Sequence, residues 1–260
     1  MTGVGPSCIP TGEDFTGEGW MRPRYERVLL KVSGEALLGG QSFGIDGKVL
    51  SRIAGEIAEA RGRGVKVAVV VGGGNIFRGV SLASAGAAGG DRVIGDQMGM
   101  LATVMNALAF RGELTRIGVP ADVLSAIPLP TVCDSFTQRG AEAAFEAGRV
   151  LLLAAGTGNP FFTTDSGAAL RAAELRCEAL FKGTSVDGVY SADPKKDKSA
   201  KRYDRISHAD VLAKGLAVMD AAAVALARDN HIPVIVFSIL QSGAFVDILD
   251  GKGRATIVSD

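Results

Sequence analysis

The sequence predicts an α/β protein, a three-layer αβα sandwich with a mainly parallel central sheet. Short apolar runs typical of buried strands alternate with longer segments of helical periodicity, and this alternation favours parallel strands covered by helices on both faces. The composition agrees, because hydrophobic residues make up 47% of the 260 positions and aromatic residues only 6%. Ala, Val, Leu and Ile therefore supply the apolar mass, which suits helices packed on a sheet.

The first predicted strand covers residues 27–32, RVLLKV. A helix is predicted over 46–64, where apolar residues recur at helical spacing behind Asp46, a residue type that caps helix N-termini. Residues 65–71, VKVAVVV, form a continuous apolar run, as expected for a strand buried on both faces. A long helix is predicted over 96–118, and its last residue, a glycine, is a plausible stop.

The middle of the chain repeats this alternation. Strands are predicted over 121–127 and 149–155, and a helix over 139–148 separates them. A further helix over 164–178 leads into a strand over 179–182.

Two helices and two strands are predicted in the C-terminal part. The helices lie near 208–215 and 220–230, and the strands cover 233–239 and 255–259. Residues 1–23 are rich in Gly, Pro and Thr and have no period, so they are expected to form a disordered tail.

Three aspartates stand where helices are predicted to start. Asp96 opens the helix over 96–118, Asp165 precedes a helix from residue 166, and Asp220 precedes the stretch AAAVALA. An aspartate in such a position accepts hydrogen bonds from the first free amide groups of the helix. The simplest interpretation of each is therefore an N-cap.

The charge balance and hydropathy pattern exclude some functions. Lys plus Arg and Asp plus Glu number 28 each, so the formal net charge is zero. A general nucleic-acid surface needs a basic excess, whereas a few placed cations are enough for an anionic substrate. No run of about 18 apolar residues predicts a membrane-spanning helix, and the N-terminus does not resemble a secretion signal.

The cysteines and histidines favour neither disulfides nor a zinc site. Cys8, Cys133 and Cys177 are far apart and odd in number, and His208 and His231 are the only histidines. There is no CxxC pair and no histidine cluster. The pattern fits a reducing cytoplasm.

Four predicted strands end in loops of small or polar residues. These loops cover 31–36, 71–79, 154–165 and 182–194. In open parallel sheets, ligands bind outside the carboxyl ends of the strands. Four such loops at one edge would expose many backbone N–H groups, which predicts a site for a large, negatively charged ligand.

The familiar phosphate-binding motifs are absent. No G-x-x-x-x-G-K-[ST] occurs, and no G-x-G-x-x-G follows a strand and opens a helix. The sequence therefore argues against a P-loop enzyme and a Rossmann dehydrogenase.

Individual residues in the loops each allow a bland interpretation. Lys31 and Lys182 end their strands and could be solvated charges. Gly72–Gly74 with Arg78 could form either a tight turn or an anion site. Turn chemistry could explain some of the Thr, Asn and Gly residues within 156–164, but hardly all of them. Their agreement on one edge is the stronger signal.

Several longer stretches carry a resemblance to a known family. They are LLKVSGEAL (29–37), VGGGNIFRG (71–79), GDQMGMLATVMNALA (95–109), SAIPL (125–129), AGTGNPFFTTD (155–165), KGTSVDGVYSADP (182–194) and LARDN (226–230). With these, the chain closely resembles the bacterial uridylate (UMP) kinases of the amino acid kinase family, from about residue 25 to the C-terminus. The resemblance implies ATP- and Mg²⁺-dependent phosphorylation of UMP to UDP by a homohexamer. It also implies one amino acid kinase domain over 24–260, with its acceptor-binding part roughly over 24–178 and its ATP-binding part roughly over 179–260.

The resemblance assigns binding residues by match. The residues expected to bind ATP are Lys31, Val32, Ser33, Gly34, Gly74, Arg78, Thr184, Tyr190 and Asp193. The residues expected to bind UMP are Gly73, Asp96, Thr157, Gly158, Asn159, Pro160, Phe161, Phe162, Thr163 and Thr164. Family members are also regulated by GTP and UTP, and Arg149 matches an Arg linked to the GTP site. Asp122 stands where an Arg is common in GTP-activated members, which weakens the expectation of GTP activation.

The chemistry of the implied reaction suggests roles for the charged residues. The acceptor is a phosphate oxygen that is largely ionised near neutral pH, so no general base is required. The reaction needs alignment and charge neutralisation, which Lys31, Lys182 and Arg78 would supply as catalytic cations. Asp165, the fourth expected catalytic residue, would orient the lysines.

Two other functions stay open at the level of sequence. One is another amino acid kinase that acts on a carboxylate or carbamate, and the threonines of 157–164 argue against it. The other is a non-catalytic nucleotide sensor, which would not need all of Lys31, Lys182 and Asp165.

Overall fold

The computed structural model describes residues 24–77, 91–194, 196–216 and 218–260. The predicted N-terminal tail, residues 1–23, lies outside these described residues.

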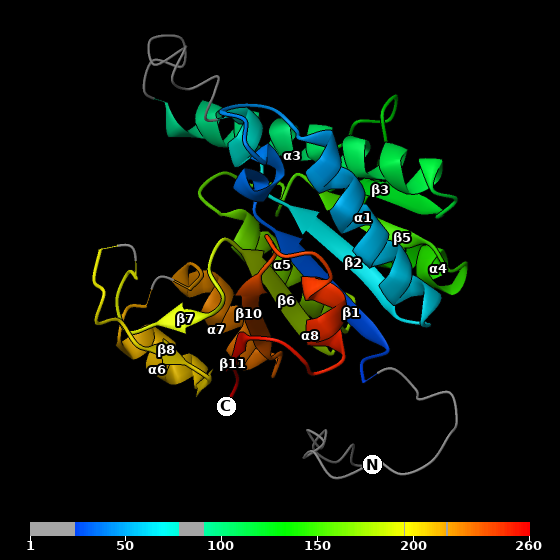
Figure 1. Ribbon diagram of the computed structural model, residues 1–260. Coiled ribbons are helices and arrows are strands. Elements are labelled where there is room, and N and C mark those ends of the chain that lie inside the picture. The colour runs from blue at the N-terminus through cyan, green and yellow to red at the C-terminus, as the bar shows by residue number, and fades with distance from the viewer. Residues whose placement is uncertain (1–23, 78–90, 195, 217) are drawn as a thin grey trace, which may run out of the picture.

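In the described part of the chain, the central sheet has nine strands and a second sheet has two. Figure 1 shows how these strands are arranged. The strands of the large sheet are β1 (Arg27–Val32), β2 (Lys66–Val71), β3 (Ala121–Ser125), β4 (Asp134–Ser135), β5 (Val150–Ala154), β6 (Ala179–Thr184), β9 (Arg205–Ile206), β10 (Val234–Ser238) and β11 (Ala255–Val258). Their order is β4-β3-β5-β2-β1-β6-β10-β11-β9, and all neighbours pair in parallel except β10 and β11. The small antiparallel sheet pairs β7 (Val189–Tyr190) with β8 (Arg202–Tyr203).

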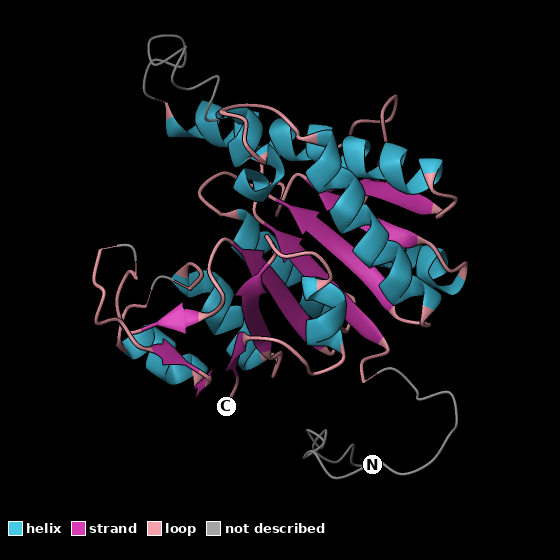
Figure 2. Ribbon diagram, in the orientation of Figure 1, coloured by secondary structure: helices cyan, strands magenta, loops and turns pink. Residues whose placement is uncertain are grey.

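Helices cover both faces of the large sheet (Figure 2). The helical elements are η1 (Gly34–Leu38), α1 (Gly47–Gly62), α3 (Arg92–Arg116), α4 (Gln138–Glu146), α5 (Thr164–Glu174), α6 (His208–Ala213), α7 (Ala221–Asp229) and α8 (Ala244–Leu249). One buried cluster joins α1, α3 and α8 to the sheet, and a second cluster joins α4, α5, α6 and α7 to the opposite face. The predicted three-layer αβα fold is therefore confirmed.

Strand β1 shows how the sequence builds both layers at once. Val28 and Leu30 point into the first cluster, whereas Leu29 points into the second. Successive side chains of a strand alternate between faces, so an uninterrupted apolar run fits only a strand with helices on both sides. By the same alternation, Lys31 belongs to the face of Leu29, which is covered by α5.

Two of the predicted helix caps are confirmed. The carboxylate of Asp46 accepts hydrogen bonds from the backbone N–H groups of Lys48 and Val49, and α1 begins directly after it. Asp220 likewise accepts from the N–H of Ala223 and caps α7.

Two other predicted caps are wrong. Helix α3 begins four residues earlier than expected, with Asp91 as its cap, so Asp96 lies inside the helix. Thr163 caps α5, so Asp165 is in the first helical turn and its carboxylate is available for other partners. In both places another cap-forming residue lies a few positions upstream, and the sequence pattern could not separate them.

Helix α3 is the one described helix that is long and apolar enough, by length and composition, to cross a membrane. Polar residues interrupt its apolar residues, so the sequence contains no uninterrupted apolar run of about 18 residues. The core helix of a globular protein passes the same test. Buried Phe110 and Leu114 pack α3 into the first cluster.

Candidate active site

The four polar loops meet at one edge of the sheet. They follow β5, β2, β1 and β6, which are consecutive neighbours and run in parallel. Because the carboxyl ends of parallel strands share an edge, this order brings the loops together, as the sequence analysis expected. We call residues 72–74 the glycine loop and residues 156–163 the threonine loop.

A buried cluster of charges lies where β1, β6 and α5 meet. The Nζ atom of Lys31 is 2.7 Å from Oδ1 of Asp165, and the Nζ atom of Lys182 is 2.6 Å from Oδ2 of the same carboxylate. Lys182 also donates a hydrogen bond to the carbonyl of Val218. The lysines are direct partners in the pairing of β1 with β6, so their side chains leave the sheet side by side on the α5 face.

The environment shifts the pKa values of this cluster. Burial opposes ionisation of Asp165, but the charges of Lys31 and Lys182 outweigh it and hold the pKa of the carboxyl below its usual value. Burial is the largest cause that lowers the pKa of Lys182, and nearby Lys31 adds to it. Two ammonium groups thus share one carboxylate, and the surplus positive charge suits a phosphate ligand.

Asp220 ties the start of α5 to the start of α7. Besides capping α7, its carboxylate accepts hydrogen bonds from the hydroxyl groups of Thr163 and Ser166. Thr163 in turn accepts from the backbone N–H of Asp165, 3.0 Å away. Asp220 therefore fixes the backbone on both sides of the carboxylate that pairs with the lysines.

The glycine loop is packed tightly against the rest of the protein. A Cβ atom on Gly73 would lie 2.8 Å from the carbonyl oxygen of Gly99 and 2.9 Å from Cβ of Ala102, both on α3. A Cβ on Gly72 would lie 2.9 Å from the backbone N of Gly34. Only Gly74 has room, because its nearest neighbour would be 3.7 Å away. Two of the three glycines are therefore needed for packing, whatever the ligand.

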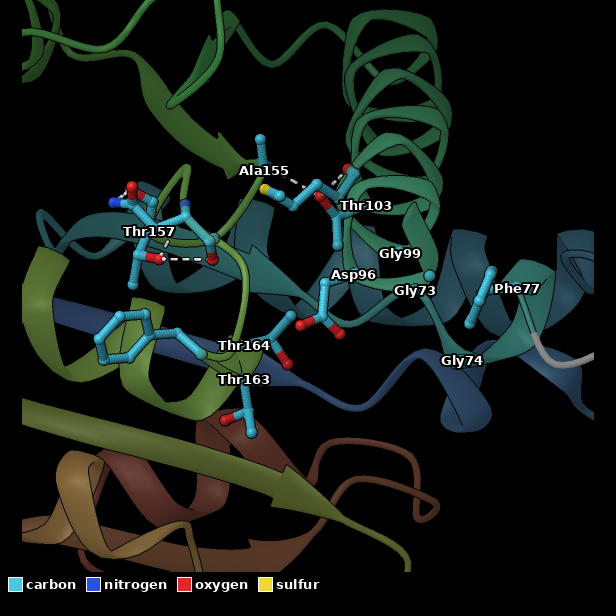
Figure 3. Close-up of a pocket in the computed structure, with 15 residues that line it drawn as sticks. Gly73, Gly74, Phe77, Asp96, Gly99, Thr103, Ala155, Thr157, Thr163 and Thr164 are labelled. Carbon is cyan, nitrogen blue, oxygen red and sulfur yellow. Dashed lines mark hydrogen bonds between the residues drawn. The ribbon is translucent and has the colours of Figure 1, made fainter. Parts of the chain in front are cut away.

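A cavity of about 220 Å³ opens between the glycine loop, α3 and the threonine loop (Figure 3). Its lining is Gly73, Gly74, Phe77, Gly95, Asp96, Gly99, Met100, Thr103, Ala155, Gly156, Thr157, Asn159, Phe162, Thr163 and Thr164. The cavity combines apolar surface with hydroxyl groups and one carboxylate, as small-ligand sites commonly do.

The structure brings most of the predicted acceptor-binding residues to this cavity. Gly158, Pro160 and Phe161 belong to the threonine loop but do not line the cavity. Asp96 does line it, and one of its carboxylate oxygens accepts the backbone N–H of Phe161 at 2.7 Å. The guanidinium of Arg92 lies over the ring of Phe161 and 3.6 Å from Asp96.

The predicted ATP-binding residues are divided between the large sheet and the small one. Gly74 lines the cavity, and Val32 is buried at the end of β1. Ser33 and Gly34 form the turn into η1. Thr184 ends β6 of the large sheet, whereas Tyr190 lies in β7 of the small sheet and donates to Asp187. Asp193 is exposed beyond β7. Arg78 lies outside the described residues.

The matched effector residue has a partner of its own. Arg149 makes a bidentate ion pair with Asp122, with Nε–Oδ2 at 2.6 Å and an Nη atom 2.7 Å from Oδ1. By the resemblance, Asp122 stands where an Arg is common in GTP-activated members of the family. The guanidinium fork of Arg149 is therefore occupied within the protein.

Sequence reasoning missed the side chains that support the loops. Asn75 and Asn106 are fully buried and bond to each other beneath the glycine loop. Thr103 on α3 accepts the backbone N–H of Ala155 at 2.8 Å and so holds the start of the threonine loop. The signal available in the sequence was that polar Thr103 and Asn106 lie among the apolar residues of the helix predicted over 96–118. A polar group that becomes buried in such a helix needs a hydrogen-bond partner.

The model of one protein family matches most of the chain. The model of the amino acid kinase family matches residues 27–238, which include the charge cluster and both loops. The chain belongs to the amino acid kinase family. Across the described residues of this family member, no group of three or more His, Cys, Asp or Glu side chains could hold a metal ion.

Relatives within this family resemble the chain over nearly its whole length. Uridylate kinase of Mesorhizobium japonicum is 65% identical, covering 92% of this chain and 99% of the relative. Uridylate kinase of Rhizobium meliloti is 64% identical, covering 92% and 98%.

Two solved structures agree with this placement in the family. The UMP kinase from Ureaplasma parvum has a TM-score of 0.85 at 38% identity and covers 92% of this chain and all of its own. The UMP kinase from Bacillus anthracis has a TM-score of 0.86 at 37% identity, covering 92% and 97%.

Proposed function

We propose that this member of the amino acid kinase family is a uridylate kinase, which transfers the γ-phosphoryl group of ATP to UMP and yields UDP and ADP. The observation that carries the proposal is the cavity that the glycine loop, Asp96 and the threonine loop line together. The Lys31–Asp165–Lys182 cluster lies at the same sheet edge, and Asp165 directly follows Thr164 of the cavity lining. Its close relatives with the name uridylate kinase support the choice of acceptor.

Phosphoryl transfer here depends on position and charge. Lys31 and Lys182 supply positive charge to the transferring group, and Asp165 holds their ammonium groups together at the sheet edge. Arg78 would add a third cation by family match. In the helical turn over 74–77, the N–H groups of Ile76 and Phe77 donate to the carbonyl of Gly73. The amides that this turn would offer to a phosphate are therefore the first two, those of Gly74 and Asn75.

No residue has to remove a proton from the acceptor. The phosphate of UMP is largely ionised near neutral pH because its second pKa is about 6. We expect Mg²⁺ to arrive with ATP as part of that substrate and to neutralise charge on its phosphates.

The cavity provides contacts for the acceptor nucleotide. Asp96 lines the cavity beside the threonine loop, and its carboxylate suits ribose hydroxyl groups. The hydroxyls of Thr157, Thr163 and Thr164 suit a polar base or phosphate. Thr184, Tyr190 and Asp193 would contact ATP on its adenosine side. The acceptor-binding part would thus lie roughly within 24–178 and the ATP-binding part within 179–260.

A coupled assay for ADP formation tests the proposal with UMP, CMP and dTMP offered in parallel. UMP should be turned over fastest. Preference for CMP, or no turnover with UMP, would reject the acceptor. ATP binding without any turnover would favour a nucleotide sensor, and a carboxylate or carbamate substrate would move the chain elsewhere in the family.

Helix α3 offers a surface for assembly with further copies of the chain. Ile94, Leu101 and Met105 are about half exposed and lie seven and four residues apart, on one face of the helix. We propose that this face is an interface in the homohexamer that the family resemblance implies. Met105→Glu should lower the mass measured by light scattering after size exclusion, and an unchanged mass would reject this interface.

GTP and UTP are the candidate effectors, and the cytoplasm is the expected location. GTP activation through Arg149 would require its release from Asp122, so we expect a weak response to GTP, and UTP stays a candidate inhibitor. Activity measured with and without each nucleotide tests both. The free, buried thiols of Cys133 and Cys177 fit a reducing cytoplasm.

A further inference from the structure

A closed pair of amides lies directly beneath the glycine loop. The Nδ2 group of Asn75 donates to Oδ1 of Asn106 at 3.0 Å, and the Nδ2 group of Asn106 donates to Oδ1 of Asn75 at 2.7 Å. Their exposed fractions are 1% and 0%. Such a pair, inside a helix–sheet layer, has no water to replace a lost partner.

The second hydrogen of each amide reaches a backbone carbonyl. Asn106 donates to the carbonyl of Gly72 at 2.7 Å, and Asn75 donates to the carbonyl of Gly44 at 3.0 Å. Carbonyl oxygens only accept, so each amide nitrogen must face its carbonyl, and this fixes the orientation of both amides. All four amide hydrogens are therefore used, and neither side chain can rotate without loss.

The Gly72 carbonyl is also confined from its other side. A Cβ atom on Gly34 would lie 2.5 Å from this oxygen and 2.8 Å from Oδ1 of Asn75. The amide pair and the turn at Gly34 thus hold the Gly72 carbonyl between them. The backbone N–H of Gly72 completes the arrangement by donating to the carbonyl of Val32 at 2.9 Å.

These contacts connect α3 to the cavity. Asn106 lies on the buried side of α3, and the residues after Gly72, Gly73 and Gly74, line the cavity. Fixing the peptide group at Gly72 therefore sets the direction in which the next amides point. Catalysis by such fixed dipoles depends on their position, since a displacement of about 1 Å can cost roughly 100-fold in rate.

We propose that Asn106 is a positioning residue for phosphoryl transfer, which acts through the Gly72 carbonyl and the Asn75 amide to aim the glycine loop at the transferring phosphoryl group. The inference rests on the proposed function. A purely structural amide pair would change the stability of the fold and leave the turnover of the folded protein unchanged.

The test compares Asn106→Leu with Leu114→Ala in the full chain. Leu is close to Asn in size but donates no hydrogen bond, so the loop loses its anchor. Leu114 is fully buried on the same helix, two turns further on, and Leu114→Ala is the matched control for lost stability. Steady-state kcat and KM for UMP are measured below the melting temperature of each variant.

We expect kcat of Asn106→Leu to fall by about 10-fold or more, while KM for UMP changes by less than about threefold, because the threonine loop is intact. Leu114→Ala should lose melting temperature and keep kcat within about twofold. If Asn106→Leu does not fold, Asn106→Asp preserves the shape and undergoes the same comparison.

Wild-type kcat in any folded Asn106 variant would overturn the inference, as would an equal loss of kcat in Leu114→Ala. Both results presuppose that the wild-type protein forms ADP with UMP. A wild-type protein without that activity would instead reject the proposed function, and the inference with it.

Discussion

The glycine loop and the threonine loop border the same cavity, but their glycines are required for different physical reasons. In the glycine loop, a side chain on Gly73 would collide with α3, although its backbone lies outside the left-handed region. In the threonine loop, Gly156 and Gly158 have φ values of +57° and +79°, which favour glycine. A Cβ on Gly156 would meet no atom within 4 Å.

This difference separates a loop fixed by packing from a loop fixed by conformation. Contacts with buried Asn75 and Asn106 leave the glycine loop little freedom. The threonine loop is held near its C-terminal end by hydrogen bonds to two carboxylates, from the backbone N–H of Phe161 to Asp96 and from the hydroxyl of Thr163 to Asp220. Replacing a glycine should therefore displace the backbone of the glycine loop, whereas in the threonine loop it should mainly make the native backbone conformation less favourable.

The largest effect is expected at Asp165, whose carboxylate pairs with both lysines directly after the threonine loop. Asp165→Asn leaves Lys31 and Lys182 side by side without a countercharge, and breaking a buried ion pair in this way costs about 3 kcal/mol or more. We expect kcat to fall by about 100-fold or more, measured in the ADP assay. Asp122→Asn, which breaks the more exposed pair with Arg149, is the control and should retain activity.

The pairing of Asp165 with Lys31 and Lys182 also predicts that the stability of the protein depends on pH. The folded-state pKa of Asp165 lies below its unfolded value, so its stabilising contribution is complete above the unfolded pKa of about 4 and is lost as the pH falls through the folded pKa. The free energy of unfolding measured in urea should therefore fall more in this acid range for the wild type than for Asp165→Asn. Parallel acid curves for the two proteins would contradict the assigned pairing.

The next effect tests the packed loop itself. Gly73→Ala places a methyl group 2.8 Å from the Gly99 carbonyl, so either the glycine loop or α3 must move. We expect kcat/KM to fall by about 10- to 100-fold and the melting temperature to drop. Full activity would show that the loop yields easily and that packing does not define it.

A smaller effect should follow from strain in the threonine loop. Gly156→Ala introduces no collision but requires an alanine at φ +57°, which costs about 1 kcal/mol. We expect KM for UMP to rise only a few-fold. Asparagine tolerates this backbone region better than alanine, so Gly156→Asn should raise KM for UMP less than Gly156→Ala does. If KM for UMP rises equally in the two variants, glycine is needed at this position because of the ligand, and the backbone conformation is not the reason.

Much of this arrangement could be predicted from the sequence because it follows from strand direction and alternation. The four polar loops follow parallel strands, so their meeting at one edge needs no tertiary information beyond the fold class. The short elements could not be found in this way, because α8 has six residues and β7 two, too few to show a period.

The supporting contacts could not be predicted because they join residues far apart in the chain. Asn75 and Asn106 are separated by 31 positions, and no spacing rule links a loop amide to a helix amide. Asp96 was expected to cap a helix, yet it reaches Phe161, 65 residues away. Hydrogen bonds of this kind depend on the final packing of α3 on the sheet, which local patterns do not encode.

The smallest effect on stability, and the sharpest separation of protein from ligand, is expected at Gly74. Its added Cβ would make an ordinary contact of 3.7 Å with Glu35, and it starts the helical turn over 74–77, where alanine is favoured over glycine. Gly74→Ala should therefore raise the free energy of unfolding by roughly 0.5 kcal/mol in urea titrations. If the phosphates of ATP approach this backbone as proposed, KM for ATP should nevertheless rise several-fold while KM for UMP stays near its wild-type value. An unchanged KM for ATP would mean that the third glycine is a simple turn residue and that the donor phosphates bind elsewhere along the edge.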